Sequence, residues 1–205
     1  MDLTNIRLYR MTHIGNVEHI LKNGVTHRTS ANSNLEYIPI GDNSLIGTRN
    51  NFSVPNGRLL GDYIPFYFGY KTPMLYVIQN GFNGVRATSP EDIVYLVTNL
   101  ESIRQSGINF FYTDGHAIDV LTRFYVPDDV ENITNQVDFE ATKAVYWKKD
   151  DDLDLKRRKE AELLLENDLP AHYINGIIVY SDSAKQMLIN GGVKLTIVVK
   201  PNYYF

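Results

Sequence analysis

The sequence predicts a single α+β domain. A chain of 205 residues is one large domain in most proteins. Segments with a strand-like apolar pattern outnumber helical segments, and the two kinds do not alternate regularly along the chain. A doubly wound parallel sheet requires that alternation, so its absence favours α+β. We find no internal repeat, low-complexity tract or linker, and therefore expect one domain over residues 1–205.

The N-terminal part predicts a strand over residues 6–11 and a helix after it. Asn16 is a plausible N-cap for this helix, and Gly24 ends it. A polar stretch with scattered Gly, Asn and Ser then covers residues 26–60. Because a loop of this length inside a compact domain is usually functional, we expect part of a binding site there.

The middle of the chain alternates short apolar runs with turn residues. We expect strands over residues 64–68 and 74–79, with Asn80-Gly81 ending the second, then a strand over 93–98, a short helix over 102–106 and another apolar run over 110–112. Residues 113–150 are charged and show little periodicity, apart from a possible helical segment over 116–122.

The C-terminal third has clearer signals. Residues 176–180 predict a buried strand, and either Ser181 or Ser183 is placed to cap a helix over 184–190. Gly191-Gly192 ends that helix, and residues 193–200 predict a final strand.

The segment 156–165, which reads KRRKEAELLL, permits two structures. Local propensity favours an amphipathic helix, in which Glu160 and Glu162 point about 200° apart. A strand would instead place both carboxylates on one face. Two carboxylates on one face, directly after a basic run, would suit a catalytic edge.

Composition and motifs exclude several classes of function. The formal net charge of −4 argues against broad non-specific binding of duplex DNA, although it permits a small basic groove. The chain has no cysteine, hence no disulfide or thiol chemistry.

The five histidines lack helical zinc spacing, and an acidic loop such as residues 150–154 is usually solvated, so we expect no metal. The chain begins without an apolar signal segment and contains no run near the ~20 apolar residues of a membrane span, which favours a cytoplasmic protein.

Several individually weak features occur together in one order along the whole chain. They are Tyr9 to His13, Asn16 with ILKNG over 20–24, Arg49, PFYFG over 65–69, PMLY over 73–76, TDGHA over 113–117, Trp147, and RRKEAE over 157–162. This series closely resembles the DarT family of DNA ADP-ribosyltransferase toxins.

The resemblance implies the ADP-ribosyltransferase fold, in which two packed, mainly antiparallel β-sheets flanked by short helices form an NAD cleft. Residues 34–51 match the family's NAD-binding element with its essential arginine. Arg49 is the match, and Arg58 competes for that role. The resemblance also implies that His13 contacts NAD, with Thr12, Ile14 and Asn16 beside it, and that Tyr67 packs on nicotinamide.

The resemblance assigns catalysis to Glu162, the glutamate of the family's A-E dipeptide. We therefore expect a helical or irregular basic lead-in up to about Arg158, followed by a strand that carries both Glu160 and Glu162. A carboxylate that accepts from the ribose 2′-OH would stabilise the oxocarbenium-like state formed when nicotinamide leaves. The acceptor of ADP-ribose would be a base in single-stranded DNA, with thymine favoured for the main branch of the family and guanine as the alternative. Arg49 would stabilise the deprotonating base or a nearby phosphate, since an arginine with a pKa above ~12 is a poor proton acceptor.

The resemblance makes residues 113–159 the substrate-recognition loop. The expected DNA contacts are Lys71, Met74, His116, Arg157 and Arg158. It also implies a macrodomain antitoxin that removes the modification.

Two departures from the family pattern keep alternatives open. Lys71 replaces an arginine of the family's turn, so a point charge replaces a bidentate group. Glu160 stands where many relatives have glutamine, and it either tunes the acceptor or is simply solvated. The alternative functions are ADP-ribosylation of RNA or protein, NAD hydrolysis alone, and non-catalytic binding of single-stranded nucleic acid.

Overall fold

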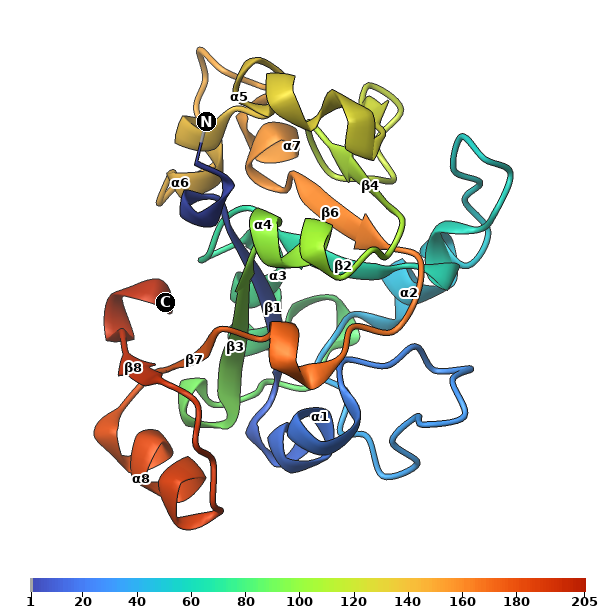
Figure 1. The fold of residues 1–205 in the computed structure, drawn as a ribbon. Helices are drawn as coiled ribbons and strands as arrows, with labels where there is room; N and C mark the ends of the chain where they lie inside the picture. Colours follow the sequence, from blue (N-terminus) through green and yellow to red (C-terminus); the bar gives the residue numbers. More distant parts are fainter. Residues whose placement is uncertain (1) are drawn as a thin grey trace.

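The structure is a computed structural model that describes residues 2–205. One eight-stranded sheet crosses the molecule in the order β5-β4-β6-β2-β1-β3-β7-β8 (Figure 1). All neighbouring strands are antiparallel except β7 and β8, which are parallel. The strands are β1 (Arg7–His13), β2 (Ile64–Tyr67), β3 (Ile93–Asn99), β4 (Phe110–Thr113), β5 (Phe124–Tyr125), β6 (Glu162–Leu165), β7 (Gly176–Val179) and β8 (Ile197–Val199).

Short helices cover the sheet, as expected for an α+β fold. They are α1 (Val17–Asn23), α2 (Asn43–Arg49), α3 (Pro73–Asn80), α4 (Leu100–Gln105), α5 (Ile133–Gln136), α6 (Phe139–Lys143), α7 (Leu155–Lys159) and α8 (Asp182–Asn190). Within residues 2–205, none of the helices combines the length and the apolar composition needed to cross a membrane.

The expected two sheets are present as two four-stranded halves of one sheet. The halves meet between β1 and β2, where the register contains a single residue pair, Tyr9 with Tyr67. Pro65 has no N–H to offer a ladder. The guanidinium of Arg10 instead donates a hydrogen bond of 2.9 Å to the carbonyl of Pro65. The strands therefore separate beyond this junction, which leaves space between the two halves.

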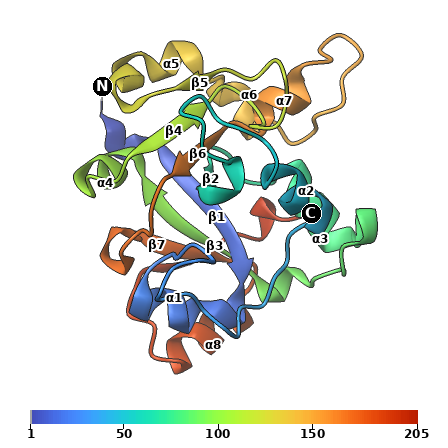
Figure 2. The same cartoon turned by 90° about the vertical axis from the view of Figure 1, so that its right-hand side faces the viewer.

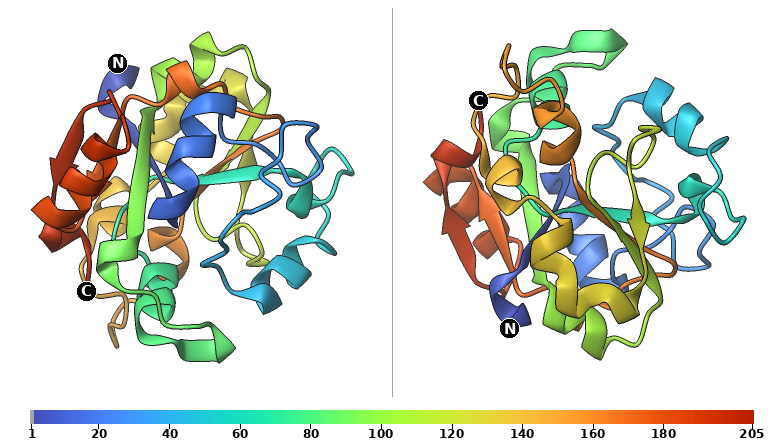
Figure 3. Two further views of the ribbon diagram at one scale, coloured as in Figure 1. Left: turned by 90° about the horizontal axis from the view of Figure 1, so that it is seen from below. Right: turned by 90° about the horizontal axis from the view of Figure 1, so that it is seen from above.

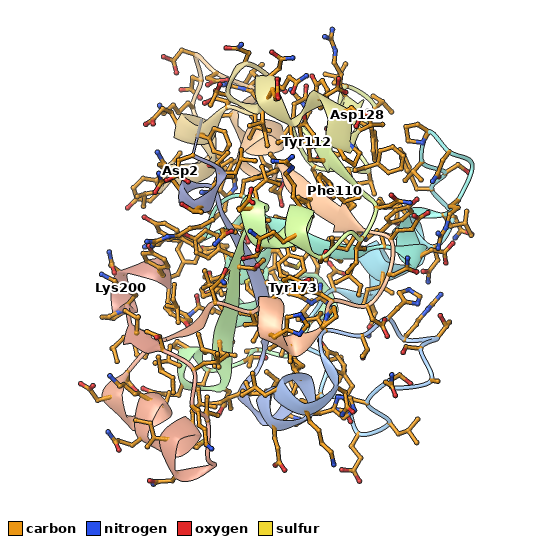
Figure 4. All side chains as sticks on the ribbon, viewed as in Figure 1. Asp2, Phe110, Tyr112, Asp128, Tyr173 and Lys200 are labelled. Carbon is orange, nitrogen blue, oxygen red and sulfur yellow. The ribbon has the colours of Figure 1, made fainter. Side chains whose placement is uncertain are left out.

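Side chains alternate between two packed layers along the strands, because strand side chains repeat every second residue. On one face, Leu8 and Leu96 join the main core with residues of α1, α4 and α8. On the other face, Tyr9 and Tyr95 pack against Leu75 and other residues of α3. Figures 2 and 3 show these helices on opposite sides of the sheet. In Figure 4, side chains fill the space around β4, where Phe110 and Tyr112 are labelled.

The prediction of a strand over residues 74–79 is wrong, since this segment forms α3. Thr72 caps the helix by accepting a hydrogen bond of 3.3 Å from the N–H of Leu75, and Pro73 occupies the first turn. Gly81 ends the helix in the left-handed conformation with φ of 69°. The Thr-Pro start and the glycine stop are ordinary helix signals, and the apolar run between them concealed them.

Other expectations about elements also differ from the structure. Residues 116–122 form turns instead of a helix, and the last strand covers only Ile197–Val199 of the expected 193–200. Helix α2 lies inside the polar stretch, where Asp42 caps it by accepting from the N–H groups of Ser44 and Leu45. Asn16 does precede α1, but its side chain makes no capping hydrogen bond.

Candidate active site

Glu162 is the first residue of β6, and its side chain is completely buried. Strand β6 lies between β4 and β2, so it is held on both edges. The basic lead-in forms helix α7, which ends at Lys159. The prediction that Glu162 lies on a strand after a helical lead-in is therefore confirmed. The prediction for Glu160 is wrong, because Glu160 caps α7 and lies outside the strand.

Three hydrogen bonds hold the Glu162 carboxylate. Arg49 Nη1 donates to both oxygens, at 3.0 Å to Oε2 and 3.3 Å to Oε1. The backbone N–H of Ala117 donates to Oε1 at 2.9 Å. A carboxylate offers about four lone-pair positions. Oε2 therefore keeps one position with which it could accept from a ligand.

Arg49 lies at the end of α2 and is the arginine that reaches Glu162. Its side chain is 14% exposed, and its Nη2 is buried without a hydrogen-bond partner among the described residues. The competing Arg58 is 42% exposed and pairs with Glu166 at 2.6 Å. Of the two arginines, Arg49 is therefore the one that pairs with Glu162, and its functional role stays a prediction.

The loop after β4 packs around Glu162 through hydrogen bonds that the types of residue in the sequence do not predict. The hydroxyl of Thr113 accepts from the N–H of Glu162 at 3.1 Å and lies 2.7 Å from the carbonyl of Gly115. This turn directs the N–H of Ala117 at the carboxylate. Sequence reasoning identified the 113–117 motif but missed Thr113 and Ala117 as site residues, since a backbone donor carries no sequence signal.

A cavity of about 550 Å³ lies across the junction of the two half-sheets. Arg10 and Met11 of β1 line it together with Tyr67 of β2. Arg49 also lines it, and the buried Glu162 lies directly behind that guanidinium. Apolar groups from the 34–51 element and α3 complete the walls: Tyr37, Ile40, Leu45, Ile46, Met74 and Ile78.

Tyr67 lies opposite Glu162 in the strand register and contributes its ring to the cavity. Burial raises the pKa of the Tyr67 phenol, and the carboxylates of Glu162 and Glu160 raise it further. The phenol is therefore neutral at physiological pH. A neutral, half-buried ring suits contact with a flat apolar group, as expected for nicotinamide.

Asn16 is not free to contact a ligand. Its Oδ1 accepts from the N–H of Ile38 at 2.9 Å, and its Nδ2 donates to the carbonyl of Ile38 at 2.9 Å and to Thr12 Oγ1 at 3.0 Å. Asn16 and Thr12 thus position the 34–51 element against β1. Both residues are buried, which gives their side chains a positioning role, while the expected contact of NAD with the backbone of Thr12 stays a prediction.

His13 and Ile14 lie at the end of β1, away from Glu162. The Nδ1 of His13 accepts a hydrogen bond of 3.1 Å from the N–H of Gly15. His13 lines a second cavity of about 560 Å³, which shares residues 39–42 of the 34–51 element with the first. Ile14 is buried in the main core, so only its backbone is available to a ligand.

The expected DNA contacts fall into two groups. Met74 and His116 line the main cavity, and Lys71 lies two residues before α3, so their contacts with DNA stay predictions. Arg157 instead pairs with Asp114 at 2.8 Å and with Asp154 at 2.7 Å. Arg158 pairs with Asp152 at 2.6 Å and with Asp138. Because carboxylates already engage both guanidinium groups, these two arginines stabilise the loop in this structure.

Glu160 is buried, so the alternative that it is simply solvated is wrong. Its only ion-pair partner in the described part of the chain is Lys156, at 3.4 Å. Burial raises the pKa of the Glu160 carboxyl, and the charges of His116 and Lys156 lower it in part.

Within residues 2–205, no group of three or more potential ligand side chains could hold a metal ion.

Comparison with known proteins identifies close similarity over the whole chain. The family described as "ssDNA thymidine ADP-ribosyltransferase, DarT" matches residues 9–205. A DNA ADP-ribosyl transferase of Escherichia coli O127:H6 is 32% identical over 97% of this chain and 93% of its own length. A DNA ADP-ribosyl transferase of Thermus sp. strain 2.9 is 34% identical over 85% of this chain and 81% of its own. A transferase–glycohydrolase fusion protein of Thermosipho africanus is 26% identical over 97% of this chain and 49% of the fusion.

Two solved structures have the same fold. Thermus sp. 2.9 DarT in complex with ADP-ribosylated ssDNA superposes with a TM-score of 0.85 and 27% identity, over 98% of this chain and 96% of that one. The same Thermus protein in complex with NAD+ gives a TM-score of 0.81 and 27% identity, over 100% and 99% of the two chains.

Proposed function

Because the chain belongs to the DarT family of single-stranded-DNA thymidine ADP-ribosyltransferases, we propose that Glu162 and Arg49 form the reacting centre at which ADP-ribose passes from NAD to thymine. The chain is an NAD-dependent DNA ADP-ribosyltransferase with the α+β fold of that family. The observation that carries the residue assignment is the buried carboxylate of Glu162, held by Arg49 at the wall of the cavity.

The main cavity has the chemistry that NAD as a substrate requires. The buried Nη2 of Arg49 has no partner among the described residues, and such a group costs free energy unless a ligand supplies an acceptor. The diphosphate and ribose hydroxyls of NAD are acceptors of this kind. Tyr67, Met74 and Ile40 offer apolar surface for a flat ring.

Glu162 acts on the ribose by electrostatic stabilisation. When the bond between nicotinamide and ribose breaks, positive charge develops on the sugar. The free lone-pair position on Oε2 accepts from a ribose hydroxyl, and the nearby negative charge stabilises that state. Arg49 covers Glu162 in this structure, so its guanidinium shifts toward the incoming substrate before Glu162 makes this contact.

Arg49 has a second role when the base attacks. N3 of thymine forms the bond to the ribose and loses its proton, so negative charge develops on the ring during the step. A guanidinium stays charged because the pKa of arginine exceeds ~12. Arg49 therefore stabilises the deprotonating base or a neighbouring phosphate, and the proton passes to another acceptor.

The test is transfer of label from NAD to an oligonucleotide that contains thymidine. Glu162→Gln keeps the size of the side chain and removes its charge, and we expect a fall in rate of about 10²–10³-fold. Glu166→Gln is the matched control, since Glu166 pairs with Arg58 outside the main cavity and its substitution leaves the rate unchanged. Consumption of NAD without labelling of DNA by the unsubstituted protein would contradict the proposal. RNA and protein acceptors in parallel test the alternative functions.

The fused glycohydrolase of the Thermosipho africanus relative supports a proposal about the partner. The chain would act as a toxin in the cytoplasm, restrained by a macrodomain protein that removes ADP-ribose from DNA. Expression of the chain alone should stop replication, and co-expression of a DNA ADP-ribosyl glycohydrolase should restore growth. Persistent toxicity with an active glycohydrolase present would contradict this partner.

A further inference from the structure

Three aromatic side chains gather at the surface beside the main cavity, of which two are exposed and one, Trp147, is half-buried. We name Tyr76, Trp147 and Phe205 the aromatic platform. Their ring centroids lie 5.7 Å (Tyr76–Trp147), 5.1 Å (Tyr76–Phe205) and 5.7 Å (Trp147–Phe205) apart. They come from α3, the loop after α6 and the C-terminal segment, which lie together in both views of Figure 3.

The platform presents ring surface to solvent. Tyr76 is 37% exposed and Phe205 is 38% exposed. The three rings pack edge to face, at interplanar angles of 71° to 80°. Phe82 stacks on Tyr76 at a centroid distance of 5.5 Å and an interplanar angle of 30°, so one face of Tyr76 is already covered. Trp147 has only edge-to-face ring partners among the described residues, and no ring stacks on its faces. Large aromatic side chains that cluster at a surface commonly mark a binding site, whereas scattered ones are ordinary.

Positive charge accompanies these rings. The ammonium of Lys71 lies 4.9 Å above the centroid of Phe205, and Lys148 and Lys149 follow Trp147 as exposed residues. Asp150 and Asp151 are also exposed, but Asp152 is paired with Arg158. Aromatic faces beside a few cations are the combination that binds unpaired bases and their phosphates.

The platform is connected to the catalytic site through two elements. Helix α3 presents Met74 to the cavity and Tyr76 to the platform, so the two surfaces are separated by about one helix diameter of ~10 Å. Lys159, three residues before Glu162, is fully buried and donates to the carbonyls of Thr142 and Ala144. This anchors the loop that carries Trp147 close to the catalytic strand.

We propose that the aromatic platform binds nucleotides that flank the target thymidine, by stacking a base on Trp147 while Lys71 contacts a backbone phosphate. This inference rests on the proposed function and adds a specificity-determining surface outside the cavity. Stacking accepts every base, so the platform selects unpaired DNA of sufficient length more than it selects sequence.

The test compares oligonucleotides with one target thymidine and either intact or abasic flanking positions, with abasic residues placed 5′, 3′ or on both sides. The unsubstituted protein should show a KM about tenfold lower for the intact oligonucleotide than for the one lacking the stacked bases. Trp147→Leu keeps apolar packing and removes the large ring. It should raise the KM for the intact oligonucleotide about tenfold, leave kcat nearly constant and abolish the difference between the oligonucleotides.

Trp147→Phe is the matched control, because it keeps an aromatic face and should retain most of the preference for intact flanks. Thermal unfolding of both variants shows whether they fold as the unsubstituted protein does. Equal KM values for intact and abasic oligonucleotides in the unsubstituted protein would overturn the platform while leaving the transferase function intact. A preference for intact flanks that survives in Trp147→Leu would also overturn it. Failure to label either oligonucleotide would instead contradict the proposed function itself.

Discussion

Arg49 uses one terminal nitrogen to hold Glu162 and leaves the other buried without a partner among the described residues. The planar guanidinium fits this arrangement because its two terminal nitrogens point in different, fixed directions. One of them can therefore keep the carboxylate in place while the other serves a ligand. Lysine could provide the charge but could not serve two fixed directions.

Arg49→Lys should reduce kcat/KM for DNA ADP-ribosylation by about tenfold to a hundredfold. The reason is the loss of one hydrogen bond to a charged group, worth about 1.5–3 kcal/mol. Steady-state kinetics with varied NAD measure the effect. Arg58→Lys, on the exposed pair with Glu166, is the control and should change little. Equal losses in both variants would mean that Arg49 has no special role.

Glu160 carries a cost in free energy that depends on pH. Burial raises the pKa of its carboxyl in the folded state above that of the unfolded chain. At low pH the group is protonated in both states and carries no penalty. As pH rises past the unfolded-state pKa, the unfolded chain releases its proton first, and the folded state loses stability relative to it.

Glu160→Gln should therefore raise the Tm at about pH 7 and leave it unchanged at about pH 4. Thermal unfolding of both proteins across this range checks the sign. The control is Glu140→Gln, since Glu140 is an exposed residue that pairs with Lys143 at 3.2 Å. Exposed pairs contribute little, so its Tm difference should stay small at both pH values. A larger stabilisation of Glu160→Gln at acidic pH would refute the assignment.

At the scale of elements, the segment before α2 is held to β1 mainly through Asn16. Hydrogen bonds of 2.9 Å run in both directions between its amide and the backbone of Ile38. This fixes the start of the 34–51 element, while Asp42 caps the helix that ends at Arg49. The position of Arg49 in the cavity therefore depends on the hydrogen bonds that Asn16 and Asp42 make.

Asn16→Ala should raise the KM for NAD about tenfold and reduce kcat less. The backbone groups of Ile38 would lose their partners, at a cost of about 1–3 kcal/mol, and the element would lose its fixed position. Asn16→Asp keeps the acceptor for the Ile38 N–H and removes the donor. Its KM for NAD should therefore lie between that of the unsubstituted protein and that of Asn16→Ala. Steady-state kinetics separate the outcomes, and a fall in kcat at constant KM would contradict a positioning role.

Sequence patterns predicted elements well where the pattern fitted only one type of element. The strand over 93–98 and the helix over 184–190 were predicted nearly as observed, as β3 and α8. The strand expected over 74–79 failed because an apolar run of this length fits both a strand and a buried helix. Glu162 is the opposite case, because helix propensity alone would have placed it on a helix, and the resemblance to a known family placed it on the strand.

At the scale of the whole molecule, the site depends on how the two half-sheets meet. Residues such as His13, Arg49 and Glu162 could be chosen from the sequence because each belongs to a motif. The distances between these residues could not be predicted, because the separation of β1 from β2 beyond Tyr9 and Tyr67 depends on packing between segments far apart in the chain. The same limit hid the ion pairs of Arg157 and Arg158, whose acidic partners include Asp114 and Asp138.

Those ion pairs have a consequence for how the protein responds to ionic strength. Binding of a single strand releases condensed counterions only as far as protein cations neutralise phosphates, and each contact adds about −0.7 to the slope of log K against log salt. Carboxylates of the chain already neutralise Arg157 and Arg158, and Lys159 is buried.

Of the cations at the aromatic platform, Lys71, Lys148 and Lys149 remain for phosphates, so the contribution of the platform to the slope should lie between about −1 and −2. Fluorescence anisotropy of a labelled oligonucleotide at several salt concentrations measures it, and a slope steeper than about −4 would show that the internal ion pairs open on DNA. With so shallow a slope, the affinity of this enzyme for DNA would change little over salt concentrations at which many nucleic-acid-binding proteins dissociate.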